Sequence, residues 1–181
     1  MPKKVQILNS KVLYDGKWVQ LTLDEIIKPD GTRATHEVVK RRDGILIIPI
    51  TNNKYYFVSQ YRYPVNEVCL EFPTGFIDDN ENHLDTAKRE LREEIGGENG
   101  TLQYIGFIWS WAGLMTQRLH VYVARDFRVT LQELEASEKD LKVITLSKTE
   151  LNKKILEGEI KNSSTLAALT LFDTYTNLDT S

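Results

Sequence analysis

The sequence GFIDDNENHLDTAKRELREEIG, residues 75–96, contains seven acidic residues, and three of them, Glu90, Glu93 and Glu94, lie within one helical turn. Carboxylates three and four residues apart share a helix face and repel, at a cost of about a few tenths of a kcal/mol per pair. A divalent cation would turn this repulsion into binding free energy. Hard cations such as Mg²⁺ take oxygen ligands, commonly a few carboxylates together with substrate phosphates. The cluster therefore indicates a site for phosphate chemistry.

The same stretch has the pattern of an amphipathic helix. Apolar residues recur at steps of three and four positions, at Leu84, Ala87, Leu91 and Ile95. This period predicts one packed face, with the carboxylates on another face. Asn82 is suited to cap the start of the helix, and Gly96 to end it in a left-handed conformation. Arg89 precedes Glu93 by four positions, so it can hold that carboxylate in place.

The spacing of the charged and glycine residues is specific. It is Gly75, five residues, Glu81, seven residues, Arg89-Glu90-Leu91, one residue, Glu93-Glu94, one residue, Gly96. This pattern resembles the signature of the Nudix hydrolases at every charged and glycine position. Gly97 is the one departure, because the family usually has an aliphatic residue there. A solvated acidic helix face is the structural alternative, but the required distances to Gly75 and Glu81 favour the functional motif.

Length and composition are those of a small enzyme. A chain of 181 residues can bury one substantial core, with a small appended sheet. Its net charge of -3 gives no general attraction to nucleic acid, so no nucleic-acid partner is expected. Cys69 is the only cysteine, which excludes a disulfide framework and a thiolate zinc site.

No membrane association is expected either. The longest apolar run, residues 45–50, is far too short to span a bilayer, and the first four residues lead into no signal-peptide core. The expected location is therefore the cytoplasm.

The order of elements predicts an α+β fold, with strands early in the chain and helices after them. Strands are expected at residues 5–13, 18–27, 32–41, 45–50, 55–60, 69–72, 102–109, 119–124 and 142–146. After the acidic helix, a capping box at Ser147 predicts a helix to about Gly158, and Asn162 or Ser163 begins a last helix to about Tyr175. We expect a Nudix-type α/β/α sandwich with a mixed central sheet as residues 45–181, preceded by an antiparallel strand unit, residues 1–44.

Three further segments narrow the resemblance. They are GKWVQLTLDEIIKPDGTRATHEVVKRRDG (16–44), SQYRYPVNEVCLEFPTG (59–75) and GEIKNSSTLAAL (158–169). All three are similar to segments of ADP-ribose pyrophosphatases and related nucleoside diphosphate sugar hydrolases. The resemblance implies cleavage of ADP-ribose to AMP and ribose 5-phosphate. It also implies a homodimer whose N-terminal strands pack on the partner or swap with it.

The resemblance gives the acidic cluster its roles. Glu90 and Glu94 would be the principal ligands of Mg²⁺, or alternatively Mn²⁺, with Glu93 completing the cluster. The backbone carbonyl of Thr74 would supply a further oxygen, and Gly75 would let the chain approach the ion. Together with Arg89, these glutamates form the expected catalytic centre.

The general base is less determined by the sequence. In similar enzymes a glutamate in a loop after the motif often serves, and the loop at residues 132–140 contains Glu138. Alignment of this loop places Lys139 at the expected position, so Glu138 is a neighbouring candidate. Glu90 or Glu93 remains the alternative.

Substrate contacts are also implied by the resemblance. Trp18 and His36, from different subunits, would sandwich the base; the alternatives are a core anchor for Trp18 and a surface strand residue for His36. Arg41 and Arg62 would bind phosphate or the terminal ribose, because guanidinium groups match these oxygens, although surface ion pairs would explain them as well. Gly113 marks a loop that lies beside the substrate in relatives.

The alternatives within this loop and in function stay open. Trp109 and Trp111 flank the loop, and its usual proline and glutamate are replaced by Ala112 and Gln117. Hydrolysis of another nucleoside diphosphate sugar, such as GDP-mannose, fits the motif equally well. A sensing module without catalysis would be expected to lack one of the three clustered glutamates, all of which are present.

Overall fold

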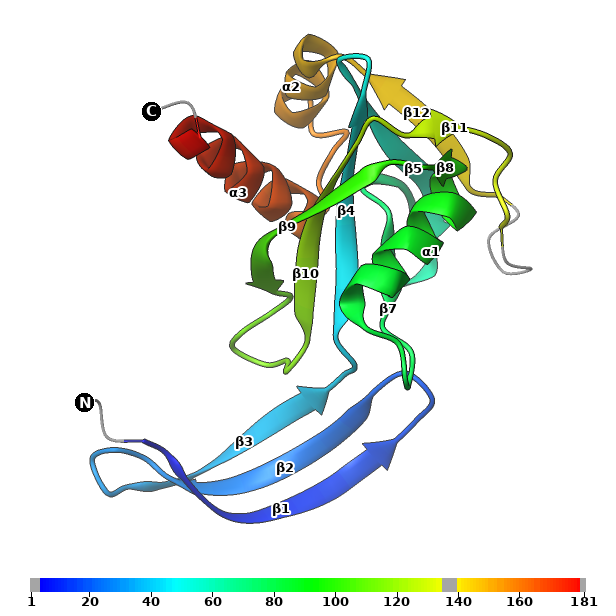
Figure 1. Ribbon diagram of the computed structural model, residues 1–181. Coiled ribbons are helices and arrows are strands. Elements are labelled where there is room, and N and C mark those ends of the chain that lie inside the picture. Colours follow the sequence, from blue (N-terminus) through cyan, green and yellow to red (C-terminus); the bar gives the residue numbers. More distant parts are fainter. Residues whose placement is uncertain (1–3, 135–139, 180–181) are drawn as a thin grey trace. The chain divides into compact units, whose positions relative to one another are not determined.

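The structure is a computed structural model that describes residues 4–134 and 140–179 (Figure 1). Contacts divide the chain into two units. One comprises Met1–Asp43 with Trp109–Arg118, and the other comprises Gly44–Ile108 with Leu119–Ser181. Each unit therefore contains segments that are far apart in the sequence. Within the described residues, no helix is long and apolar enough to cross a membrane.

The first unit is built on a three-stranded antiparallel sheet. Its strands, in the order β1-β2-β3, are β1 (Gln6–Asp15), β2 (Gln20–Ile27) and β3 (Arg33–Lys40). The tight turn between β2 and β3 is closed by Asp30, whose carboxylate accepts hydrogen bonds from the backbone N–H of Thr32 at 2.9 Å and from its hydroxyl at 2.7 Å. Gly31 has a φ of +89°, which suits a glycine. The three strands predicted for this unit are confirmed.

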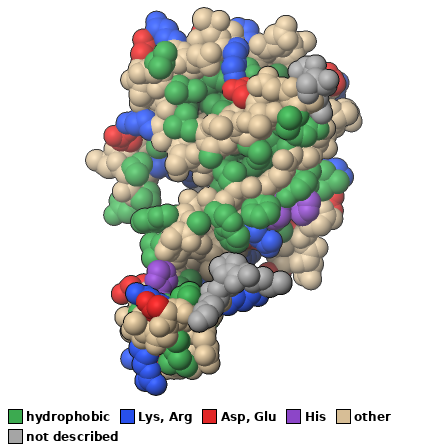
Figure 2. Space-filling model, turned by 90° about the vertical axis from the view of Figure 1, so that its left-hand side faces the viewer, with side chains coloured by type: hydrophobic (Ala, Val, Ile, Leu, Met, Phe, Trp, Pro, Cys, Tyr) green, Lys and Arg blue, Asp and Glu red, His purple; other side chains and the backbone are tan. Residues whose placement is uncertain are grey.

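A distant segment completes the first unit. This segment is Trp109–Arg118. The backbone N–H of Val39 in β3 donates to the carbonyl of Leu114 at 2.9 Å, and the carbonyl of Val39 accepts from the N–H of Thr116 at 3.1 Å. By contrast, every residue of β1 is exposed, including Ile7, Val12 and Tyr14. Hydrophobic side chains at the surface are visible in the space-filling view (Figure 2).

The second unit is organised by a seven-stranded mixed sheet (Figure 1). Its strands are β4 (Gly44–Thr51), β5 (Lys54–Arg62), β6 (Glu67–Glu71), β7 (Thr74–Phe76), β9 (Thr101–Trp109), β10 (Arg118–Arg125) and β12 (Lys142–Leu146). The main order is β12-β5-β4-β10-β9, with β6 paired to β5 and β7 to β4. β10 runs parallel to β4, whereas β5 and β7 run antiparallel to it.

Smaller elements lie beside this sheet. They are a 3₁₀ turn η1 (Tyr63–Val65) and a two-stranded pair of β8 (Gly97–Glu98) and β11 (Arg128–Val129). The sequence predicts neither these smaller elements nor β7. Two-residue pairings and a strand that contains Gly75 are set by tertiary contacts rather than by residue propensity.

In the part of the chain that the structure describes, three helices pack on the sheet, and their ends follow the expected capping chemistry. They are α1 (His83–Ile95), α2 (Lys148–Leu156) and α3 (Ser163–Asp179). The Asn82 carboxamide oxygen accepts from two backbone N–H groups at the start of α1, and Gly96 ends that helix with a φ of 70°. Ser147 and Glu150 form the capping box of α2. α3 extends to Asp179, four residues beyond the predicted end.

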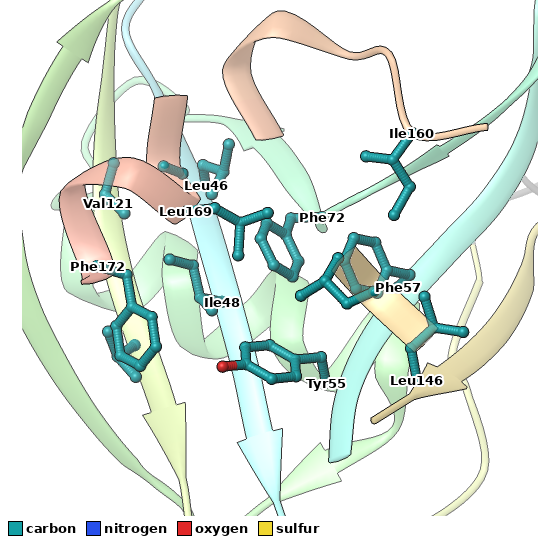
Figure 3. Close-up of a cluster of buried hydrophobic side chains, with 13 residues drawn as sticks. Leu46, Ile48, Tyr55, Phe57, Phe72, Val121, Leu146, Ile160, Leu169 and Phe172 are labelled. Atoms are coloured by element: carbon teal, nitrogen blue, oxygen red, sulfur yellow. The ribbon is translucent and has the colours of Figure 1, made fainter. Parts of the chain in front are cut away.

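The sheet separates two hydrophobic clusters. Leu46 and Ile48 of β4 face a cluster that contains side chains of α2 and α3 (Figure 3). Ile45 and Ile47 face a second cluster beneath α1. All four of these β4 residues are fully buried, because helices cover both faces of the strand. The predicted α+β fold is confirmed, with its α/β/α sandwich and a separate antiparallel N-terminal sheet.

The core on the α3 side predicts a large effect of one substitution. Phe57 is fully buried, and its ring stacks on Phe72 with the centroids 4.4 Å apart. We expect Phe57→Ala to lower the free energy of unfolding by about 3–5 kcal/mol in urea denaturation, because it leaves a cavity. The control Leu156→Ala removes a side chain that is 88% exposed and should change stability by less than about 0.5 kcal/mol. Equal effects of the two substitutions would contradict this packing.

Candidate active site

The centre of the site is the guanidinium of Arg89, which lies among three carboxylates. Its Nε and Nη2 groups donate to the two oxygens of Glu81, at 3.2 and 3.1 Å. Its Nη1 group donates to Glu90 at 2.8 Å and to Glu93 at 3.0 Å, and Nη2 also donates to the carbonyl of Phe76 at 3.3 Å. These bonds use all five N–H groups of an arginine. The predicted contact between Arg89 and Glu93 is confirmed, and Glu81 is an additional partner.

The charges of this network stabilise one another. The hydrogen bonds from Arg89 hold the pKa of Glu81 below its usual value, and burial, which acts in the opposite direction, does not cancel them. Burial also opposes the charged form of Arg89. The hydrogen bond to Glu81 and the charge of Glu90 outweigh burial and raise the pKa of Arg89. The guanidinium is therefore a permanent cation that fixes the orientation of its acidic neighbours.

Gly75 allows the backbone to lie against Glu90. It belongs to β7, which is held in place by its pairing with β4, where Gly75 lies opposite Ile45. A Cβ atom at this position would lie 1.8 Å from the Oε1 atom of Glu90, a distance that no side chain can adopt. A side chain at position 75 would therefore displace the carboxylate of Glu90, while the approach of this backbone to a metal ion stays a prediction. Thr74 precedes it on the same strand.

The acidic residues of α1 are more buried than the helix pattern predicts. Glu90 is 7% exposed and Glu94 is 2% exposed, whereas Leu84, which was expected on the packed face, is 36% exposed. Ala87, Leu91 and Ile95 form the packed face as predicted, but the expectation that the carboxylates lie apart from the buried side was wrong. α1 contacts β7 as well as β4 and β5, so the sheet covers the side of the helix that carries Glu90.

The carboxylate oxygens of the acidic cluster are the type of ligand that a divalent ion takes, but they are too few to coordinate the ion by themselves. In residues 4–134 and 140–179, no three His, Cys, Asp or Glu side chains are grouped closely enough to hold a metal ion. The donors that are present are oxygens, on buried carboxylates four residues apart, and the missing Cβ of Gly75 leaves the backbone close to Glu90. These features fit Mg²⁺ or Mn²⁺, which take further ligands from water and substrate phosphates. Glu90, Glu94 and Thr74 are the residues that would hold the ion.

The chain returns to the end of α1 before the loop that was expected to hold the general base. The Thr130 N–H donates to the carbonyl of Gly96 at 2.7 Å, and the Gln132 side chain donates to the carbonyl of Glu94 at 2.6 Å. Glu133 forms an ion pair with Arg92 at 3.1 Å. Glu138 lies outside the described residues.

The other predicted arginine of this unit has a partner that the sequence did not indicate. Arg62, at the end of β5, donates from Nε to the carboxylate of Glu71 at 2.6 Å. Glu71 ends β6 and is only 4% exposed. The sequence feature that could have indicated this pair is the carboxylate four residues before the motif glycine, because a buried acid requires a basic or polar partner.

The remaining predicted residues belong to the first unit. Trp18 is 53% exposed with the Lys17 ammonium 4.4 Å from its ring centroid, so it is not a core anchor. His36 is an exposed residue of β3, and its Nε2 lies 3.3 Å from the carbonyl oxygen of Gly113. The backbone N–H of Arg41 lies 3.3 Å from the hydroxyl of Thr116. The structure therefore places the His36 ring within hydrogen-bonding distance of the Gly113 backbone.

The loop that carries Gly113 is fixed by a buried side chain. Gln117 accepts a hydrogen bond from the hydroxyl of Ser110 and donates to the carbonyl of Arg42, both at 2.9 Å. Its burial gives Gln117 a structural function. Trp109, the last residue of β9, is 51% exposed, and Trp111 of the loop is 62% exposed.

Comparison with known proteins agrees with this geometry. The NUDIX domain family matches residues 40–165, and the family described as the nucleoside diphosphate sugar hydrolase N-terminal domain matches residues 5–39. The first match covers the glycine, the acidic helix and the sheet that supports them.

Individual relatives are similar over most of their length. The methanol dehydrogenase activator of Bacillus methanolicus is 29% identical over 90% of this chain and 89% of its own. The ADP-ribose pyrophosphatase of Mycobacterium tuberculosis is 30% identical over 91% of this chain and 81% of its own. The crystal structure of an ADP compounds hydrolase matches 99% of this chain and 97% of that chain with a TM-score of 0.86. At 20% identity, this structure supports the fold alone.

The arginine network predicts a pH-dependent loss of stability. Arg89→Gln would leave the carboxylates around it without their shared cation. The side chains of Arg89 and Glu81 are 24% and 22% exposed, between the surface and buried cases, so we expect a loss of roughly 1–3 kcal/mol at pH 7. Because the pKa of Glu81 is lowered from 4.5 in the folded protein, its contribution is present above pH 4.5 and is lost as the pH falls through the lower folded value.

Urea denaturation of Arg89→Gln and the wild type between pH 3 and pH 7 tests this prediction. The stability gap between them should be largest at neutral pH and should shrink in acid. The matched control is Lys88→Gln, the neighbouring cation on α1, whose side chain is 61% exposed beside Asp85. A gap for Arg89→Gln that is independent of pH, or no larger than that of the control, would refute the proposed coupling.

Proposed function

This chain belongs to the Nudix hydrolases, and we propose that it hydrolyses the pyrophosphate bond of ADP-ribose to give AMP and ribose 5-phosphate. The observation that carries this proposal is the combination of two features in one chain. The acidic motif is complete and organised around Arg89, and residues 5–39 match the N-terminal domain of nucleoside diphosphate sugar hydrolases. The relative from Mycobacterium tuberculosis is named an ADP-ribose pyrophosphatase, which supports the choice of substrate.

The proposed reaction is the attack of water on one phosphorus of the pyrophosphate. The bond between that phosphorus and the bridging oxygen breaks, and each product keeps one phosphate. Mg²⁺ or Mn²⁺ held by Glu90, Glu94 and the Thr74 carbonyl would neutralise phosphate charge and acidify the attacking water. Glu93 supports this cluster, and Arg89 keeps Glu90 and Glu93 in fixed orientations through its bonds of 2.8 and 3.0 Å.

A proton acceptor is needed when water attacks. Glu138 is the proposed general base, and it belongs to the segment that follows the contacts of Thr130 and Gln132 with the end of α1. Glu90 or Glu93 is the alternative, since both already lie at the site.

We propose separate residues for holding the substrate. Arg62, whose side chain is 41% exposed, would bind phosphate or ribose oxygens, and Arg41 would do the same. The exposed indole of Trp18 would stack on the base, together with His36, beside Gly113. The strand unit of residues 1–44 thus takes part in base binding and dimerisation, and residues 45–181 carry the hydrolytic chemistry.

The main alternative is the same chemistry on another nucleoside diphosphate sugar, such as GDP-mannose. The motif does not distinguish these substrates, because both contain the same pyrophosphate. A hydrolysis screen of nucleoside diphosphate sugars with identification of the products separates them. ADP-ribose should give the highest kcat/KM. A higher value for another nucleoside diphosphate sugar would show that this compound, and not ADP-ribose, is the preferred substrate. If none of them is hydrolysed, the result would support a sensing module instead.

The metal assignment leads to a prediction for Glu94. Glu94→Gln keeps the shape of the side chain but removes its charge, so we expect kcat to fall roughly a thousandfold, or about 4 kcal/mol of transition-state stabilisation. EDTA should abolish turnover, and Ca²⁺ should substitute poorly because its coordination is larger and looser. The control is Glu98→Gln at a half-buried residue, which removes a carboxylate paired with Arg128 and should retain activity. Near-normal activity of folded Glu94→Gln at saturating Mg²⁺ would show that Glu94 is not a ligand.

We also propose that the protein is a homodimer formed through its N-terminal strands, by packing or by swapping. β1 is an edge strand, and apolar side chains along it are strongly exposed: Ile7, Leu8, Val12, Leu13 and Tyr14. Exposed edge strands of this kind tend to pair with another chain. A second copy of the same strand is a suitable partner because it forms a closed two-fold contact.

Light scattering tests this assembly at micromolar concentration. We expect a particle of twice the chain mass of 20.9 kDa. Val12→Lys should shift the mass toward the monomer, because it places a charge in the apolar strand. Lys11→Gln, on the same strand, is the control and should leave the dimer intact. A wild-type particle of 20.9 kDa would refute the dimer and any site shared between subunits.

A further inference from the structure

A buried acid precedes the acidic motif in the chain without belonging to it. Glu71 is the last residue of β6, and its side chain is 5% exposed. It precedes Gly75 by four positions, so it lies at the start of the segment that leads to the site. A buried carboxylate is stable only if both of its oxygens are hydrogen-bonded or paired with a cation.

Both oxygens of Glu71 have such partners. Oε1 accepts from Nε of Arg62 at 2.6 Å and is 2.5 Å from Nη2 of the same guanidinium. Oε2 accepts from the side-chain nitrogen of Asn162 at 2.8 Å. Glu71 therefore connects the end of β5 to the residue before α3.

Asn162 is fixed in turn by the start of α3. Its side-chain oxygen accepts from the Thr165 N–H at 2.9 Å, which caps the helix. The Thr165 hydroxyl accepts from the backbone N–H of Phe72, the residue after Glu71, at 3.1 Å. These three hydrogen bonds and the peptide bond between Glu71 and Phe72 form a closed ring that holds the carboxylate.

The contact uses only part of the Arg62 guanidinium. Nε and Nη2 are turned to Glu71, whereas Nη1 bonds to none of the residues that the structure describes. The Arg62 side chain is 41% exposed although its partner is buried. Glu71 thus fixes the orientation of the Arg62 guanidinium from its buried side. The N–H groups on the exposed side can donate to an anionic oxygen.

We propose that Glu71 is a positioning residue, which holds Arg62 so that its outer N–H groups bind a phosphate or ribose oxygen of the substrate. The inference rests on the proposed function for the identity of the ligand, and on the contacts above for the positioning. Arg62 is flexible without such a partner, and a preorganised guanidinium binds an oxyanion with less loss of side-chain entropy. The charge of Glu71 is required, because Oε1 and Oε2 both accept from donors.

The first experiment is a double-mutant cycle on substrate binding. Glu71→Gln replaces one acceptor by a donor, so it loses a bond either to Arg62 or to Asn162. We expect it to raise KM for ADP-ribose roughly tenfold with little change in kcat, because Arg62 is held alike in ground and transition states. In an Arg62→Ala background the same substitution should change KM less than about twofold, because Glu71 acts through Arg62.

The second experiment observes Arg62 without using activity. Its Nε–H signal in NMR spectra, assigned by its loss in Arg62→Lys, should exchange slowly with water in the wild type. In Glu71→Gln the signal should shift and exchange faster. The matched control is Glu67→Gln, on the same strand, which removes an exposed ion pair with Lys161 and should leave both KM and the Arg62 signal unchanged.

Two outcomes would overturn the inference. An unchanged Arg62 signal in Glu71→Gln would show that the acid does not hold the guanidinium. An equal rise of KM in both backgrounds, with a lower melting temperature in both, would show a general structural role. If the wild type hydrolyses no nucleoside diphosphate sugar, the proposed function fails, and the NMR measurement still decides whether Glu71 positions Arg62.

Discussion

The guanidinium of Arg89 is the constraint on which the organisation of the site depends. Three carboxylates cannot share one part of a helix and its preceding loop without a cation among them. Arg89 supplies that cation from within the helix and also bonds to the carbonyl of Phe76, so it ties the glycine strand β7 to α1. The position of Gly75 against Glu90 then follows, because the strand lies so close to the helix that a Cβ atom at position 75 would collide with the Glu90 side chain.

Features that depend on neighbouring residues could be predicted from the sequence. The Asn82 cap, the left-handed Gly96 and the contact of Arg89 with Glu93 each require only a few positions along one helix. Except for β7, the strands of both sheets were likewise indicated by their apolar and β-branched composition.

Features that depend on tertiary packing could not be predicted in this way. The burial of Glu90 requires β7 to dock on β4, and the partner of Arg62 is a carboxylate on a neighbouring strand. The attachment of Trp109–Arg118 to β3 joins positions more than seventy residues apart, such as His36 and Gly113, whose separation is 77. Periodicity and capping rules carry no information about such contacts, since they describe one element at a time.

The parallel pairing of β4 with β10 has a consequence for what the acidic motif alone can do. The pairing begins with Gly44 opposite Leu119, and the whole motif lies in the chain between these two residues. Tyr122 and Ala124 of β10 belong to the cluster that packs beneath α1. A fragment that ends before β10 would contain every residue of the motif and lack part of the surface that buries its helix. The hydrolytic centre therefore depends on a fold that includes β10. A short peptide with the sequence of the motif would have the same charges but would not form the site.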